Sequence, residues 1–136
     1  MDKTELKKRT KQFALRVIKL VDALPSTTAG RVIGSQLVRS GTSVGANYRA
    51  ACRGRSTAEF IAKIGNVEEE VDESAWWLEL VMEAELLPVH HVQPLWKEAD
   101  ELTAIFTATG HTAKKNSSLR KSSFRKSEIR NPKSEI

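Results

Sequence analysis

The sequence has almost no cysteine, on which many small secreted and metal-binding proteins depend. Cys52 is the only cysteine among 136 residues, so the chain forms no internal disulfide and no site of four cysteine ligands. No run approaches the roughly 20 apolar residues of a membrane span, and no apolar signal core follows the charged stretch 2–11. We therefore expect a cytoplasmic protein that is neither secreted nor membrane-embedded.

Strand patterns are missing as well. No segment alternates apolar and polar residues with a period of two, so we assign no β-strands. Hydrophobic residues make up 40% of the chain and charged residues 29%, which is typical of a soluble globular protein, and the length fits one domain. The sequence predicts a single all-α domain.

Four stretches carry apolar residues at alternating steps of three and four, the spacing of amphipathic helices in a bundle. They predict helices over about residues 4–24, 29–53, 57–86 and 91–109, joined by short connections. Pro25, the capping box at 56–59, Pro88 and Gly110 mark the boundaries. Residues 1–109 are therefore expected to form an antiparallel up-and-down four-helix bundle. The inward positions are Leu6, Thr10, Phe13, Val17, Leu20, Leu24; Ile33, Leu37, Ser40, Val44, Asn47, Ala51; Phe60, Ile64, Val67, Val71, Ser74, Leu78, Val81; and Val92, Leu95, Ala99, Leu102, Phe106.

The second predicted helix has an unusually small and polar inner face. Gly34, Gly41 and Gly45 each cost a helix up to about 1 kcal/mol relative to alanine. They are expected only where a neighbouring backbone comes close, so this helix should pack tightly against another.

Residues 110–136 are polar and basic, with Phe124 as their only aromatic residue. Burying so few apolar groups does not offset the entropy of ordering the chain, so we expect a disordered basic tail. The motif Lys-Ser-Glu-Ile occurs in it twice, at 126–129 and 133–136.

Charge is distributed in blocks along the chain. Lys and Arg outnumber Asp and Glu by 12 to 3 in residues 1–56 and by 8 to 2 in residues 110–136, whereas residues 57–109 carry 2 against 12. Such blocks suit either pairing between subunits or attraction of a polyanion to the basic parts.

Motifs of catalysis and metal binding occur only in unsuitable contexts. Residues 41–45 match G-x-S-x-G, but Ser43 falls inside a predicted helix rather than on a strained strand-to-helix turn. The adjacent His90 and His91 diverge on a helix and cannot grip one metal together. The carboxylates at 68–73 lack the Glu-x-x-His partners of a di-iron bundle. We predict no catalytic residues, no metal site and no cofactor, and hence no enzyme.

Two further groups of residues are candidates for interactions. Trp76 and Trp77 are adjacent and cannot both face the same core, so one of them is expected to face a partner subunit. Clustered cations at a sequence pI of about 9.5 are typical of a phosphate-backbone binder. The candidate nucleic-acid contacts are Lys7, Lys8, Lys11, Arg39, Arg49, Arg53 and Arg55.

The stretch Leu37–Asn47, followed by Ser56, Glu59–Lys63 and Glu73–Leu80, resembles the four helix bundle protein family, also called 23S ribosomal RNA intervening-sequence proteins. The resemblance spans about residues 5–109. The sequence departs from the usual pattern at Gly41, where alanine is common, and in its long tail. The motif positions are Arg39, Ser40, Ser43, Asn47, Glu59 and Glu73, which we interpret as structural, with the polar inner face bonded to carboxylates such as Glu70 or Glu73.

The resemblance implies a homopentamer with a central channel, and similarity to the accessory variability protein of diversity-generating retroelements, which binds nucleic acid and works with a reverse transcriptase. It supplies no catalytic residues. Two functions stay open: an oligomeric, sequence-nonspecific RNA- or DNA-binding accessory protein, or a protein-interaction scaffold that binds no nucleic acid.

Overall fold

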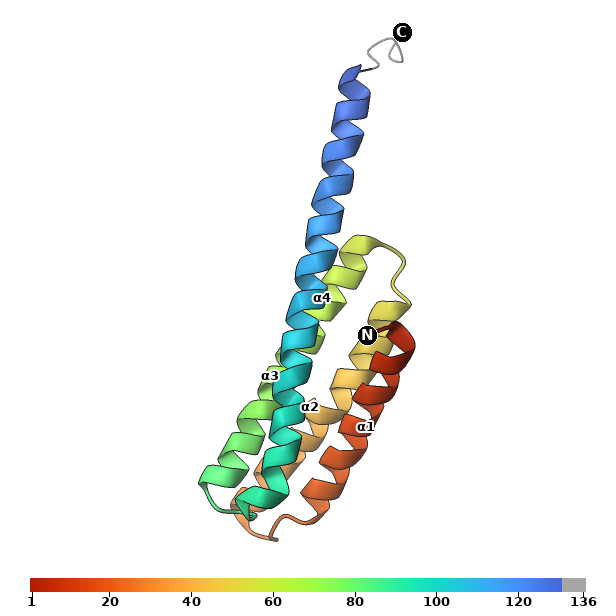
Figure 1. The fold of residues 1–136 in the computed structure, drawn as a ribbon. Coiled ribbons are helices and arrows are strands. Elements are labelled where there is room, and N and C mark those ends of the chain that lie inside the picture. The colour runs from red at the N-terminus through yellow and green to blue at the C-terminus, as the bar shows by residue number, and fades with distance from the viewer. Residues whose placement is uncertain (131–136) are drawn as a thin grey trace.

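A computed structural model of the chain describes residues 1–130, with side chains up to Ser123. The described residues form four helices, α1 (Lys3–Asp22), α2 (Thr28–Cys52), α3 (Thr57–Glu83) and α4 (Val89–Arg130). α2 packs against both α1 and α3, while α4 packs against α3 and less extensively against α1. Successive helices run in opposite directions (Figure 1), which confirms the predicted all-α, antiparallel up-and-down four-helix bundle.

The inward positions predicted from helical spacing form most of the core. Those of α4 and α1 are all buried, as are those of α3 except for Phe60, which is partly buried. Leu24, which was predicted to end the first helix, lies just beyond α1 and is also partly buried. In α2 the prediction was less accurate, because Ile33 and Asn47 are only half-buried and Tyr48 occupies the core instead. The Tyr48 ring lies 5.3 Å from that of Phe106, centroid to centroid, in a tilted pair.

Three glycines of α2, namely Gly34, Gly41 and Gly45, face α1 or the residue that closely follows it. A Cβ atom added at Gly41 would come within 2.8 Å of both Val17 methyl groups, and one added at Gly45 within 3.3 Å of the Thr10 hydroxyl. Gly34 faces Val21 and Leu24 in the same way, at 3.2 Å. The predicted close packing of this helix is confirmed, and its partner is α1.

Local signals define the helix ends. The side chains of Asp2, Thr27 and Ser56 cap α1, α2 and α3, each accepting a hydrogen bond from the backbone N–H three residues on. At the end of α3, the N–H of Leu86 donates to the Val81 carbonyl at 3.0 Å and that of Glu85 to the Met82 carbonyl at 3.1 Å. This is a Schellman motif in which Glu85, at φ 56°, holds the left-handed position that glycine usually takes.

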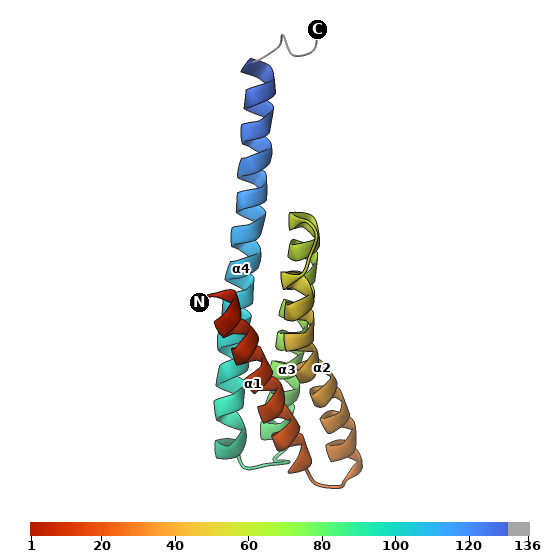
Figure 2. The ribbon, with the colours of Figure 1, turned by 90° about the vertical axis from the view of Figure 1, so that its right-hand side faces the viewer.

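The predicted helix end at Gly110 is wrong. α4 continues to Arg130 and projects well beyond the bundle (Figures 1 and 2), so the segment predicted as a tail begins as helix. Gly110 is buried without a positive φ, and an added Cβ would come within 3.0 Å of a Glu68 carboxylate oxygen. This glycine therefore allows α3 to pack closely against α4, and it does not end the helix. The last part of the predicted tail, residues 131–136, lies outside the described residues.

Candidate functional site

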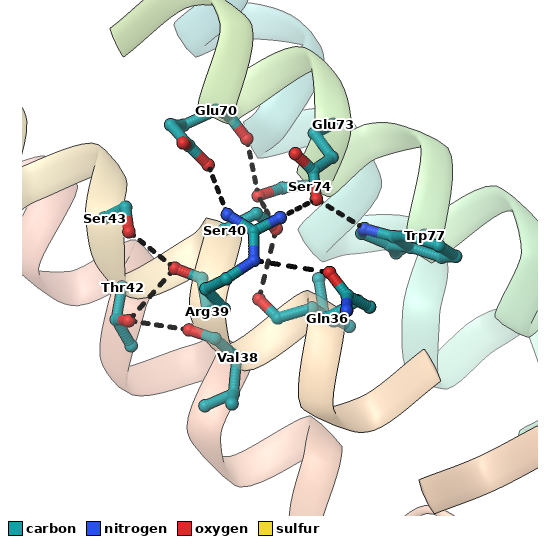
Figure 3. A network of polar contacts seen from close by, with 11 residues as sticks. Gln36, Val38, Arg39, Ser40, Thr42, Ser43, Glu70, Glu73, Ser74 and Trp77 are labelled. Atoms are coloured by element: carbon teal, nitrogen blue, oxygen red, sulfur yellow. Dashed lines mark hydrogen bonds and ion pairs between the residues drawn. The ribbon is translucent and has the colours of Figure 1, made fainter. Parts of the chain in front are cut away.

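A buried pair of hydroxyl groups joins α2 to α3 (Figure 3). Ser40 and Ser74 are both fully buried, and their Oγ atoms lie 2.9 Å apart. The Ser74 hydroxyl donates either to Ser40 or to the Glu70 carbonyl at 2.8 Å, and Ser40 has the Leu37 carbonyl at 3.3 Å. All polar groups here find partners while the small side chains let the two helices approach closely.

Arg39 lies at the edge of this seam and binds two carboxylates of α3. Its guanidinium donates to Glu70 at 3.4 Å and forms a shorter ion pair with Glu73. The Glu73 carboxylate also accepts a hydrogen bond from the indole N–H of Trp77 at 3.0 Å. The Arg39 side chain is 47% exposed, so the pairs contribute little to stability, but they neutralise its charge. Arg39 is therefore a poor phosphate contact compared with the other cations of its group.

The G-x-S-x-G stretch lies inside α2. The hydroxyl of Thr42 donates to the Val38 carbonyl at 2.6 Å and that of Ser43 to the Arg39 carbonyl at 2.7 Å, so both groups satisfy themselves within their own helix. This is not the geometry of a nucleophile elbow. Ser43 also does not reach the α3 carboxylates, unlike Arg39 in the same motif.

The two adjacent tryptophans of α3 differ in their surroundings. Trp77 is half-buried and hydrogen-bonded to Glu73, whereas Trp76 is 55% exposed. Gly65, three turns earlier on α3, would meet no atom within 4 Å if it carried a Cβ. Trp76 and Gly65 thus lie on an open face of α3, and Trp76 is the exposed member of the pair.

The remaining six candidate cations gather toward one end of the bundle. Lys7, Lys8 and Lys11 are exposed on the first half of α1, and Arg49, Arg53 and Arg55 are exposed at and just beyond the end of α2. These segments share one end because α1 and α2 are antiparallel (Figure 1). Within the described residues, none of the six side chains forms an ion pair. We call these six residues the basic end.

Arg9 differs from its lysine neighbours. Its guanidinium donates to both Glu98 oxygens at 2.7 Å and to Glu101 at 2.6 Å, which joins α1 to α4. The hydrogen bond to Glu98 raises the pKa of Arg9 above its ordinary value. Sequence reasoning missed this link, although the spacing of three between Glu98 and Glu101 places both carboxylates on one helix face.

A groove of about 850 Å³ opens at the same end of the bundle, between the start of α1, the α2–α3 connection and α4. Cys52 and Phe60 lie in its lining together with three cations, Lys3, Arg55 and Arg120. Sequence reasoning missed this groove because one wall belongs to the segment of α4 predicted as a disordered tail.

The described residues also bear on metal binding and membrane insertion. His90 and His91 are exposed at the start of α4, with ring centroids 4.3 Å apart. Among the described residues, no three His, Cys, Asp or Glu side chains gather closely enough to hold a metal ion. None of the helices described is both long and apolar enough to span a membrane.

The fold and its seam define an all-α bundle protein with a polar α2–α3 interface and a cationic end. Residues 2–108 match the 23S rRNA-intervening sequence protein family, and the chain belongs to that family. A solved protein of unknown function from the S23 ribosomal protein family of Bacteroides thetaiotaomicron VPI-5482 is similar, with 30% sequence identity and a TM-score of 0.71. The similarity covers 76% of this chain and 95% of that one. No curated protein matches the chain.

Proposed function

We propose that this protein is a non-enzymatic, homo-oligomeric bundle of the cytoplasm that binds RNA or DNA without sequence specificity. The observation that carries this proposal is the basic end, where six exposed cations share one region without ion-pair partners among the described residues. Asp2 and Glu59 lie nearby, but both carboxylates accept backbone N–H hydrogen bonds at helix starts.

The chemistry of the basic end explains the lack of sequence specificity. Lysine and arginine side chains bind phosphates through their charge and N–H donors, and phosphates carry no base information. The proposed assembly is a homopentamer, as the family resemblance implies, and a ring of subunits would multiply the weak contacts of each basic end.

The alternative function is a scaffold that binds only protein. It is favoured by the open face of α3, where Trp76 is 55% exposed beside the acidic residues Glu69 and Asp72. A basic surface of a neighbouring subunit is the natural partner for such a face. In that arrangement the cations of α1 would form ion pairs with the acidic face of a neighbouring subunit, and no nucleic acid would bind.

A binding titration separates the two functions. Fluorescence anisotropy of a labelled duplex should show binding that weakens steeply as salt rises, because condensed counterions are released. The double variant Lys7→Ala/Arg53→Ala should bind duplexes of every sequence more weakly. It should also reduce the magnitude of the negative slope of log K against log salt by about 2.

The matched control is Lys19→Ala/Lys97→Ala, which removes two exposed cations from the other end of the bundle. It should leave both affinity and slope nearly unchanged. Equal losses in the two double variants would show that net charge alone attracts the duplex, and the absence of binding at low salt would favour the scaffold.

A further inference from the structure

The groove at the basic end is built partly by residues that lie beyond the family match. Most of its α4 wall comes from Thr109, Thr112, Ala113, Asn116 and Arg120, whereas the match ends at residue 108. The Arg120 guanidinium donates to the Thr57 hydroxyl at 3.1 Å, which links this wall to the first residue of α3. The extension of α4, which projects beyond the bundle (Figures 1 and 2), therefore supplies part of the groove lining.

The groove combines an apolar floor with a cationic rim. We call its buried and half-buried apolar residues Leu6, Ala51, Phe60 and Ile105 the floor, and its exposed cations the rim. Lys3, Arg55 and Arg120 also line the groove, and no Asp or Glu is among the described residues that line it. Such a surface fits a partner with flat apolar groups and a negative charge. A volume of about 850 Å³ lies within the range of ligand sites.

We propose that this groove binds single-stranded nucleic acid, with unpaired bases against the apolar floor and phosphates at the cationic rim. This inference rests on the proposed function and names the strand form that the protein prefers. Bases of a duplex are stacked on one another and present no free face to the floor, whereas unpaired bases stack on aromatic side chains regardless of their identity.

Phe60 is the aromatic residue of the floor, and Lys3 covers it in the free protein. The Lys3 ammonium lies 5.6 Å from the centroid of the Phe60 ring, a weak cation–π contact at an exposed site. A base that stacks on Phe60 displaces this ammonium, which then meets the phosphate of the same nucleotide. Binding thus exchanges one contact of Lys3 for a stronger one.

Anisotropy with a labelled oligothymidylate and with a duplex of equal length tests the preference. We expect the full chain to bind the single strand about tenfold more tightly than the duplex. Arg120→Ala should weaken single-strand binding more than Lys121→Ala, which removes the same charge from an exposed position outside the groove. Ala113→Trp, which fills the groove, should also weaken it, whereas Ser118→Trp on the exposed side of the same helix should not.

Cys52 gives a second measurement, because the only thiol of the chain lies in the groove. Saturating oligothymidylate should slow its reaction with a small thiol reagent at least severalfold, while circular dichroism confirms that each variant remains helical. If the duplex and the single strand bind equally and the thiol reacts at an unchanged rate, the groove proposal fails and the proposed function stands. If neither nucleic acid binds, both fail. Protection of the thiol by an acidic, aromatic peptide but not by oligothymidylate would assign the groove to a protein partner instead.

Discussion

Gly41 of α2 lies directly against Val17 of α1, so close that an added Cβ would come within 2.8 Å of both valine methyl groups. The β-branched Val17 has little rotamer freedom in a helix and is fully buried, so it cannot move aside cheaply. Of the three glycines at this contact, Gly41 leaves the least room for a side chain, so the α1–α2 distance depends most on this position.

Gly41→Ala is expected to destabilise the bundle by about 1–3 kcal/mol, because the overpacking outweighs the gain in helix propensity. Chemical denaturation measures this change in the free energy of unfolding. Gly65→Ala is the control: it meets no atom within 4 Å and should stabilise α3 by up to about 1 kcal/mol. Similar changes in the free energy of unfolding for Gly41→Ala and Gly65→Ala would refute the clash. So would fully additive effects of Gly41→Ala and Val17→Ala, because removing the valine methyl groups should relieve it.

Glu85→Gly should stabilise the protein by about 1 kcal/mol. Glu85 has a φ of 56°, which costs an L-residue free energy that glycine does not pay, and its side chain is exposed. The thermal midpoint should rise, whereas Glu83→Gly, at the last residue of α3, should lower it. A fall in both variants would mean that Glu85 makes a contact that outweighs its backbone cost.

Ser40→Ala and Ser74→Ala should each cost about 1 kcal/mol, since each leaves a buried hydroxyl with one partner fewer. The double variant should cost clearly less than the sum, because removing both hydroxyls leaves no unsatisfied pair. A double-mutant cycle by denaturation measures this coupling. Strictly additive costs would show that the hydroxyl contact contributes nothing between α2 and α3.

Tyr48 should ionise only well above pH 10. Burial, assisted by the neighbouring Cys52 thiol, raises its pKa above the ordinary value of 10.0. The folded protein then holds the phenolic proton that the unfolded chain releases, so stability is lost as pH rises above about 10, by roughly 1.4 kcal/mol per pH unit. Tyr48 is the only tyrosine, so its ultraviolet absorbance reports the titration directly.

Two comparisons check this result. In denaturant the midpoint should return to about 10, and Tyr48→Phe should lessen the fall in stability between pH 10 and 11. A native midpoint at the ordinary value would show that the phenol is solvated.

Helical spacing sufficed to predict the bundle because each helix buries one face along most of its length. It failed in α2, where small residues surround the axis and weaken the contrast between faces, so that Asn47 was chosen over Tyr48. It also could not decide which of Trp76 and Trp77 is exposed. That depends on where α2 contacts α3, and the sequence alone does not specify this rotation.

The extension of α4 was missed for a different reason. Composition predicts whether an isolated segment orders itself, and residues 111–123 bury little. As a continuation of a formed helix, however, the segment does not pay the cost of nucleation. The Arg39 pairs with Glu70 and Glu73 were expected from the motif, whereas the groove was not, because Arg120 was assigned to a disordered tail.

Light scattering of the full chain with and without a short labelled nucleic acid tests the central claim most directly. At about 50 mM salt we expect a particle of five 15.2-kDa chains whose mass rises when nucleic acid is added, and at about 200 mM salt most of that added mass should be lost. An oligomer whose mass is the same with and without nucleic acid at low salt would contradict the account and leave a protein scaffold.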